Sequence, residues 1–370
     1  EEEEEGWKQQ QQQQPTDTTK PNSAVVRLNS KTRQIHLLSI LPLTSSSSSS
    51  TNNSNKDNEI YRKPIDFRIY LEAAGWLAFK HFNDRNPRVI PQIQELLGDC
   101  DIQMTMELRD SRFRPIDAVL QLQQVYQNLH ETTLNINNNN QDGRCGRSPL
   151  PFALLGSARS AVTQTLSILG GAYELPQISS SSTSSSLDNK GISPYFTRTV
   201  PTNVGDAKAI AIYLGDYLKV AYLGVIYIRD SFGVAYFEKL REESKKRKRL
   251  FRIVPASYED GNDESITAAI SRLQKANVKY IVGIFNPRTW RKVLHAAIDH
   301  NIIGREGYTW LFTEASLEFT QSDFKLQDPY LARAIHGSGV ILLDVPPNPK
   351  LDQCLDELGG LDDSLRNEFM

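Results

Sequence analysis

The chain has 370 residues, of which 39% are hydrophobic, and a formal net charge of −2. This length is enough for two compact domains with a sizeable core, and the near-neutral charge gives no general attraction to nucleic acid or to anionic membranes. No apolar run approaches the roughly 20 residues that a membrane-spanning helix needs.

Three segments of low complexity precede or interrupt the patterned part of the chain. Residues 1–33 begin with a run of Glu and continue with a run of Gln, and we expect them to be disordered because they bury too little apolar surface to offset the entropy of ordering. The Ser/Asn-rich inserts 44–60 and 131–149 are expected to be long surface loops. The chain starts with Glu1 rather than Met and ends without a capped helix, so we expect a fragment of a longer protein.

Hydrophobic periodicity predicts strands and helices in alternation. Strands are expected at 34–43, 101–110, 151–156, 175–178, 221–228, 250–256, 279–285 and 308–313. Helices are expected at 66–83, 114–129, 158–172, 204–219, 232–247, 263–276 and 287–300. This alternation predicts an α/β protein with parallel sheets covered by helices on both faces. The segment 193–203 breaks the alternation and is the expected crossover between two α/β lobes.

Signatures of catalysis and metal binding are scarce. The sequence has no GxGxxG, Walker, HExxH or GxSxG pattern, and its histidines pair with nothing at a ligand spacing. Cys100, Cys145 and Cys354 fit no zinc site and are compatible with either one disulfide or three free thiols. The basic run 245–249 ends a predicted helix, where cations complement the helix dipole, and we favour this explanation over a nuclear signal or a phosphate-binding patch. We therefore expect a protein that is not an enzyme and has neither cofactor nor metal.

Two groups of hydroxyls follow neighbouring predicted strands. Ser160 lies after the strand at 151–156, at the start of a helix, where free N–H groups and the helix dipole favour an anion. The serine-rich loop 179–186 follows the next strand. Because both groups emerge from carboxyl ends of strands in one lobe, they face the same edge and can hold one carboxylate between them. The pattern equally allows Ser160 to be only a helix cap and the loop to be exposed polar filler.

Residues 153–211 resemble the ligand-binding ectodomain of class C G-protein-coupled receptors, which include the metabotropic glutamate and GABA-B receptors. Residues 278–312 look most like the GABA-B type. The segments QIHLLSILPLT and MELRDSRFRPIDAVLQLQQV match the family's first two strand–helix units. The resemblance covers about 34–345 and implies the type I periplasmic-binding-protein fold, in which two doubly wound lobes close on a ligand like a flytrap.

The resemblance also implies a domain order. Lobe 1 would comprise residues 34–200, lobe 2 residues 201–336, and residues 337–370 would begin an incomplete return to lobe 1. The rest of lobe 1 and any seven-helix domain would lie outside this chain.

By the same resemblance, five residues match positions that contact ligands. Ser160 and Thr183 match the hydroxyl residues that hold the ligand carboxylate, and Ser181 lies at a neighbouring contact. On lobe 2, Phe232 falls where glutamate receptors use an aromatic side chain to cover the ligand. Glu314 falls near their acidic partner for the ligand amine.

Two further ligand positions depart from the family. Asn203 stands where glutamate receptors use an aspartate for the α-amine, which argues against a simple copy of their site, although Glu314 can still pair with an ammonium group. Asn286 stands where GABA-B receptors have a tyrosine. Both departures keep open a receptor subunit that binds no ligand.

A disulfide position also differs. Phe113 and Arg159 both stand where GABA-B receptors have a disulfide pair, so that bridge is absent. Cys100 and Cys145 each precede a predicted strand on the same side of lobe 1, and we expect them to pair instead.

The resemblance therefore implies the extracellular ligand-binding region of a GABA-B-like receptor at the plasma membrane. It would sense a small carboxylated ligand, an amino acid or GABA-like zwitterion, form a homo- or heterodimer, and act on a G protein through a transmembrane domain outside this chain. No nucleic acid is expected as a partner. The alternatives on the same fold are a transporter's solute-binding protein, the sensor of a receptor guanylate cyclase, and a ligand-silent receptor subunit.

Overall fold

The computed structural model describes residues 33–42, 66–88, 90–97, 102–138, 150–246, 251–286, 288–305, 307–313, 328–341 and 349. The predicted disorder before residue 33, the insert 44–60 and the expected Cys100–Cys145 disulfide lie outside these residues, as does Cys354. None of the described helices combines the length and the apolar character that crossing a membrane requires.

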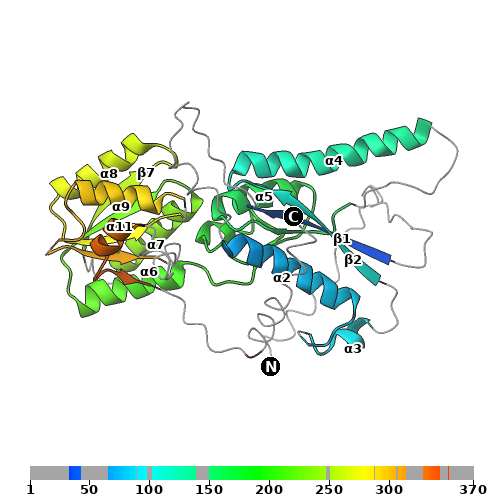
Figure 1. Ribbon diagram of the computed structural model, residues 1–370, viewed down its shortest axis with the longest axis horizontal. Coiled ribbons are helices and arrows are strands. Elements are labelled where there is room, and N and C mark those ends of the chain that lie inside the picture. The colour runs from blue at the N-terminus through cyan, green and yellow to red at the C-terminus, as the bar shows by residue number, and fades with distance from the viewer. Residues whose placement is uncertain are drawn as a thin grey trace, which may run out of the picture.

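Two five-stranded sheets, each between layers of helices, form two lobes (Figure 1). The first sheet has the order β2-β1-β3-β4-β5, with β1 Arg33–Leu41, β2 Ile102–Asp110, β3 Ala153–Gly156, β4 Gln177–Ser179 and β5 Phe196–Arg198. The second has the order β10-β9-β8-β6-β7, with β6 Tyr222–Ile228, β7 Arg252–Tyr258, β8 Tyr280–Ile284, β9 Thr309–Phe312 and β10 Gly339–Val340. All recorded pairings are parallel, which confirms the two-lobed α/β fold.

The helices follow the expected alternation. Those of the first lobe are α2 Asp66–Asn83, α3 Ile93–Leu97, α4 Pro115–Asn138, α5 Ser160–Ala172 and the short 3₁₀ turn η3 Ser185–Asp188. Those of the second are α6 Val204–Ala211, the π-helical turn η4 Ile212–Tyr217, α7 Ser231–Lys246, α8 Asp263–Lys275, α9 Trp290–Asp299 and α11 Pro329–Ala334.

Three elements differ from the prediction. α4 continues to Asn138, into the expected loop 131–149, because extending an existing helix costs little compared with starting one. β5 lies within the expected crossover 193–203, where three residues are too few to show a period of two. β10 pairs with β9 in the second sheet, so the boundary drawn at residue 336 differs from the structure at this strand.

The second sheet is covered on both faces. Along β6, Leu223 and Val225 contact the core beneath α6 and α7, whereas Ile226 and Ile228 contact the core beneath α8 and α9. Successive strand residues point to opposite faces, so a continuous apolar run such as YLGVIYI is what a strand buried on both sides requires. Figure 1 shows α8 and α9 on one side of this sheet and α6 on the other.

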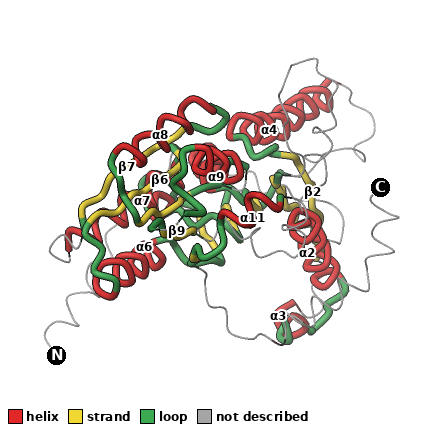
Figure 2. Tube along the Cα trace, turned by 60° about the vertical axis from the view of Figure 1, so that its left-hand side comes forward, coloured by secondary structure: helices red, strands yellow, loops and turns green. Residues whose placement is uncertain are grey.

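The first sheet packs against α4 and α5 through a smaller core. Leu38 and Ile40 of β1 are fully buried against Leu122 of α4 and Leu166 of α5. On the other side, α2 contacts β2, and Figure 2 shows this edge strand between α2 and α4. This layering holds the N-terminus of α5, and with it Ser160, at the carboxyl edge of the sheet.

Candidate ligand-binding site between the lobes

The serine loop after β4 is an ordered part of lobe 1. The Ser179 and Ser182 hydroxyls donate to the carbonyl oxygen of Ser157 at 2.8 and 3.0 Å, and Ser182 Oγ also lies 2.7 Å from Thr163 Oγ1. Ser179, Ser182 and Ser184 are fully buried. The alternative of exposed polar filler is therefore wrong for these serines, whose hydroxyls replace water by bonds within the protein.

Ser160 lies at the start of α5 but is not its cap. The N-cap position is Arg159, whose side chain makes no capping bond, and Ser160 is the first helical residue. Ser160 Oγ instead accepts a hydrogen bond from the Ser184 N–H at 3.3 Å, and Ser181 Oγ donates to the Ala158 carbonyl at 3.4 Å. The structure thus brings the two predicted hydroxyl groups together at the N-terminus of α5.

Thr183 and Asn203 adjoin this group. The Asn203 N–H donates to the Thr183 carbonyl at 2.9 Å. The Thr183 hydroxyl makes no hydrogen bond within the described part of the chain. Asn203 is 1% exposed, yet neither Oδ1 nor Nδ2 has a hydrogen-bond partner among the described residues. A buried amide without hydrogen-bond partners is unusual, and it indicates a position suited to a polar group from outside the chain.

Phe232 is brought next to the serine loop from lobe 2. The Ser184 hydroxyl donates to the Ser231 carbonyl at 2.7 Å, which joins the loop to the start of α7. Phe232 follows directly and packs edge-on against Tyr236, with ring centroids 6.0 Å apart. Its ring is partly buried by the lobe 2 cores, so only part of it is free to cover a ligand.

Asn286 is largely committed to hydrogen bonds within lobe 2. Asn286 Oδ1 accepts hydrogen bonds from the Arg288 and Thr289 N–H groups at 2.9 and 3.0 Å and from the Thr289 hydroxyl at 3.0 Å. Its carbonyl therefore holds the turn before α9, and Nδ2 alone lacks a partner among the described residues. Glu314 lies outside the described residues.

Buried polar atoms without a hydrogen-bond partner gather after the strands of both sheets. In the described part of the chain, those that follow a strand include Ser111 Oγ after β2, Ser157 Oγ after β3, Thr202 Oγ1 and both side-chain amide atoms of Asn203 after β5, Ser231 Oγ after β6, Asn286 Nδ2 after β8 and Thr313 Oγ1 after β9. Other buried atoms without a hydrogen-bond partner lie elsewhere, such as Gln177 Oε1 within β4 and Asp117 Oδ2 within α4. The carboxyl ends of strands are where open α/β sheets bind ligands. Both lobes therefore present uncommitted polar groups at the edge where this fold binds its ligands.

A group of charges that no sequence pattern predicts joins the lobes. Arg159 Nη2 lies 3.0 Å from Asp230 Oδ2, and Arg159 Nη1 lies 2.9 Å from Asp260 Oδ2. Since Arg159 follows β3 while the aspartates follow β6 and β7, the carboxyl ends of the two sheets face each other here. An aspartate just before a helix, such as Asp230 before α7, is a capping signal, but no local pattern could pair it with Arg159.

Arg159 also joins the two positions where the resemblance places a disulfide. Its Nη1 donates to the Phe113 carbonyl at 3.0 Å. A hydrogen bond from a guanidinium group thus connects the turn after β2 with the start of α5.

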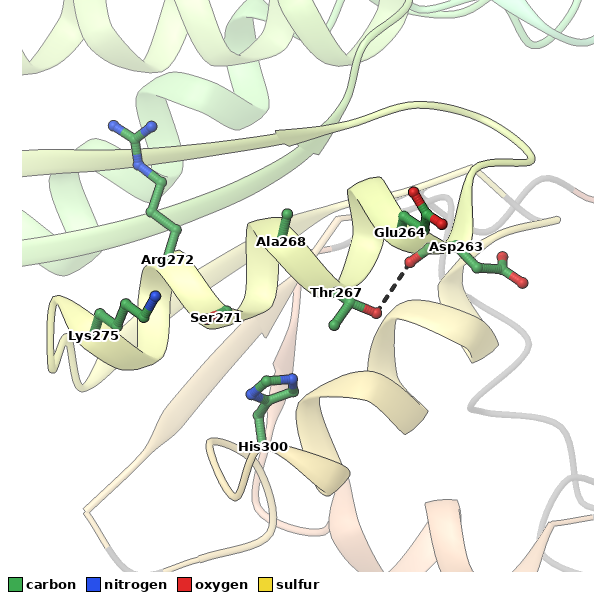
Figure 3. Close-up of a pocket in the computed structure, with 8 residues that line it drawn as sticks. All are labelled: Asp263, Glu264, Thr267, Ala268, Ser271, Arg272, Lys275 and His300. Carbon is green, nitrogen blue, oxygen red and sulfur yellow. Dashed lines mark hydrogen bonds between the residues drawn. The ribbon is translucent and has the colours of Figure 1, made fainter.

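A separate groove lies on the outer surface of lobe 2 (Figure 3). It has a volume of about 860 Å³ and is lined by Asp263, Glu264, Thr267, Ala268, Ser271, Arg272, Lys275 and His300. It is open to solvent and shares no residue with the group around Ser160. We therefore assign the candidate site to the region between the lobes and not to this groove.

The described side chains form no group suited to a metal ion. Within these ranges, no three His, Cys, Asp or Glu residues come together in a way that could hold an ion. The interlobe aspartates are paired with Arg159.

Comparison with known proteins agrees with this fold. The receptor family ligand binding region matches residues 89–368. The extracellular calcium-sensing receptor of Mus musculus is 28% identical over 167 residues, 45% of this chain and 15% of the receptor, and that of Homo sapiens shares the same figures. The metabotropic glutamate receptor of Drosophila melanogaster is 25% identical over 164 residues, 44% of this chain and 16% of the receptor.

The relatives just named are class C G-protein-coupled receptors and not enzymes, and the matched part spans less than a fifth of each. The family match covers most of the chain, including both sheets apart from β1. The chain belongs to the receptor family ligand binding region, with calcium-sensing and metabotropic glutamate receptors among its relatives.

Proposed function

We propose that this chain is the extracellular ligand-binding region of a class C receptor that senses a small carboxylated ligand by closing its two lobes. The observation that carries the proposal is the set of unpaired, buried polar atoms at the carboxyl edges of both sheets, above all the amide of Asn203. Burying such groups without partners costs free energy, and a polar ligand between the lobes supplies the partners.

The carboxylate binds at the N-terminus of α5. Ser160, Ser181 and Thr183 surround this end of the helix, where the dipole and the first N–H groups favour negative charge. The Thr183 hydroxyl is uncommitted within the described residues and donates directly to the ligand. Ser160 and Ser181 act partly by holding the loop.

The other end of the ligand meets lobe 2. Phe232 covers its apolar part, Asn203 offers an uncharged donor and acceptor, and Glu314 pairs with an ammonium group. Asn286 donates a hydrogen bond to the ligand through Nδ2. A zwitterion such as an amino acid or GABA has both the carboxylate and the ammonium that this set requires.

Binding acts by shifting a conformational equilibrium. A ligand that touches both lobes has more contacts in the closed form, so it raises the closed population by the difference in its affinity for the two forms. In the complete receptor, that shift would pass to a seven-helix domain and a G protein at the plasma membrane, within a homo- or heterodimer. The GABA-B-like subtype is part of this proposal and rests on the resemblance of residues 278–312.

The test is thermal and denaturant unfolding of the 370-residue chain with a panel of amino acids and GABA. A ligand at about 100 times its Kd raises the free energy of unfolding by roughly 2.7 kcal/mol. Thr183→Val removes the hydroxyl and keeps the shape of the side chain, so we expect the ligand-induced shift to disappear while the ligand-free stability stays the same.

The matched control is Ser180→Ala, because Ser180 lies in the same loop but is exposed. This variant should keep the full shift. A ligand shift that survives Thr183→Val would contradict the carboxylate site, and a folded chain that responds to no compound would favour the ligand-silent subunit.

A further inference from the structure

We propose that Arg159 is a latch that favours the closed arrangement of the lobes before any ligand binds. The latch comprises Arg159 of lobe 1 with Asp230 and Asp260 of lobe 2. The inference deepens the proposed function, since it concerns the closure on which that sensing depends.

The geometry is that of one guanidinium held between two carboxylates. Arg159 Nη2 is 3.0 Å from Asp230 Oδ2 and Nη1 is 2.9 Å from Asp260 Oδ2. The side chains of Arg159 and Asp230 are 11% and 10% exposed, and that of Asp260 is 28% exposed. At this depth the pairs are screened less by salt and water than a surface pair, so their electrostatic contribution is larger.

Lobe 1 also helps to hold the guanidinium in position. Nη1 also donates to the Phe113 carbonyl at 3.0 Å, and Arg159 directly precedes α5. A planar group with fixed donors loses little entropy when it binds a second carboxylate. Arg159 is therefore oriented for the aspartates by contacts that persist when the lobes separate.

Lobe 2 presents two like charges that need this cation. Asp230 and Asp260 follow neighbouring strands, β6 and β7, and share one guanidinium between them. In the closed form without Arg159, both carboxylates would face lobe 1 with no counter-charge from it, a costly arrangement for buried ions. In the open form water solvates them. Loss of the cation therefore moves the equilibrium toward the open form.

The latch adjoins the ligand site. Arg159 is followed by Ser160, whose Oγ accepts from the Ser184 N–H, and the Ser184 hydroxyl donates to the Ser231 carbonyl across the lobes. Closing the latch thus brings the serine loop and the start of α7 together. A ligand then meets a site that is already partly assembled, which raises its apparent affinity in proportion to the closed fraction.

The test measures the distance between the lobes without any ligand. Spin labels are attached through a non-natural ketone amino acid at the exposed ends of α5 and α8, Ala172 and Lys275, so that the native cysteines remain untouched. We expect a short distance, from closed molecules, to be present beside the longer distance of open molecules in the unmodified chain. Arg159→Gln and Asp260→Asn should each raise the ratio of open to closed molecules by about tenfold.

Asp260 is the cleaner partner to change, because Asp230 Oδ1 also accepts the N–H groups of Phe232 and Gly233 at the start of α7. The matched control is Arg229→Gln. Arg229 forms an ion pair with Glu259 of the same length, 2.9 Å, but within lobe 2 and with the arginine side chain 57% exposed. This variant should leave the distance distribution unchanged.

A charge exchange separates electrostatics from packing. Arg159→Asp alone should open the lobes, and adding Asp260→Arg should restore part of the closed population. If Arg159→Gln does not fold, Asp260→Asn and the charge exchange still test the latch. Equal distance distributions in the unmodified chain and Asp260→Asn would overturn the latch.

The outcome is independent of the ligand panel. A chain that binds none of the compounds but opens on Asp260→Asn would keep the latch and remove the sensing proposal. A chain that binds a ligand through Thr183 but shows no latch effect would keep the sensing proposal and remove the latch.

Discussion

Asn286, Thr289 and Tyr258 form a buried network beside the candidate site. The Tyr258 hydroxyl lies 2.8 Å from Thr289 Oγ1, and Thr289 in turn donates to Asn286 Oδ1. Because the Thr289 hydroxyl donates its hydrogen to Asn286, its oxygen accepts the hydrogen bond from the Tyr258 hydroxyl. This arrangement explains why Asn286, expected as a ligand residue, has only Nδ2 left for that role.

Burial raises the pKa of the Tyr258 phenol above its ordinary value of 10.0, against the opposing effect of its bond to Thr289. A raised pKa means that the folded state holds this proton more tightly than the unfolded state does. The stabilisation is therefore complete below pH 10 and is lost as the pH rises above it, by about 1.4 kcal/mol per pH unit.

Tyr258→Phe should lower the free energy of unfolding by about 1 kcal/mol at pH 8, because the buried hydrogen bond is lost. Between pH 9 and pH 11 the variant should lose less stability than the unmodified chain, since this proton no longer contributes. Denaturant unfolding at each pH measures the free energy of unfolding of the variant and of the unmodified chain. Parallel pH curves would show that Tyr258 ionises no less readily in the fold than in the unfolded chain.

At the scale of elements, α7 begins unusually close to the end of β6. A Cβ atom on Gly233 would come 2.0 Å from the Ile228 carbonyl oxygen, which is backbone and cannot turn aside. Asp230 holds the same turn by accepting the N–H groups of Phe232 and Gly233. This close approach of α7 to β6 determines the position at which Ser231 and Phe232 face lobe 1.

Gly233→Ala should destabilise the chain by about 1–3 kcal/mol or more, because the helix must move away from the strand. Gly205→Ala is the matched control in α6. An added Cβ there meets nothing within 4 Å, so this change should be neutral or stabilising by up to about 1 kcal/mol. Chemical denaturation of both variants tests the contrast, and an equal loss at the two glycines would refute the steric argument.

The elements also show how far periodicity carries a prediction. The helix expected at 66–83 matches α2, and those expected at 158–172 and 263–276 differ from α5 and α8 by at most two residues at an end. Long amphipathic segments repeat their signal over several turns. β5 and the turn η3 are too short to repeat any signal. Pairing with β4 defines β5, and the hydrogen bond from the Ser184 hydroxyl, at the N-cap of η3, to the Ser231 carbonyl of lobe 2 helps to define η3.

At the scale of the whole molecule, the two lobes have unequal cores. Lobe 2 contains two buried clusters on opposite faces of its sheet, whereas the described residues of lobe 1 form one smaller cluster. Local opening costs less where fewer apolar contacts are broken. Lobe 1 should therefore unfold locally more readily than lobe 2.

Amide hydrogen exchange of the ligand-free chain should show slower exchange in β6 than in β1, although both are interior strands of their sheets. A bound ligand should slow exchange near Ser184 and Ser231, where the lobes meet. Equal protection of β6 and β1 would contradict the argument that the smaller core of lobe 1 makes it easier to unfold locally.

The sequence by itself determined the α/β class, the alternation of elements and the placement of Ser160 and the serine loop at one sheet edge, because these follow from local periodicity and from the parallel direction of the strands. The tertiary structure decided which hydroxyls are free and which charges join the lobes. Ser160 Oγ is committed to Ser184, and Arg159 reaches Asp230 across 71 residues. Hydrogen-bond partners so far apart in the chain are selected by packing and burial, which no local pattern records.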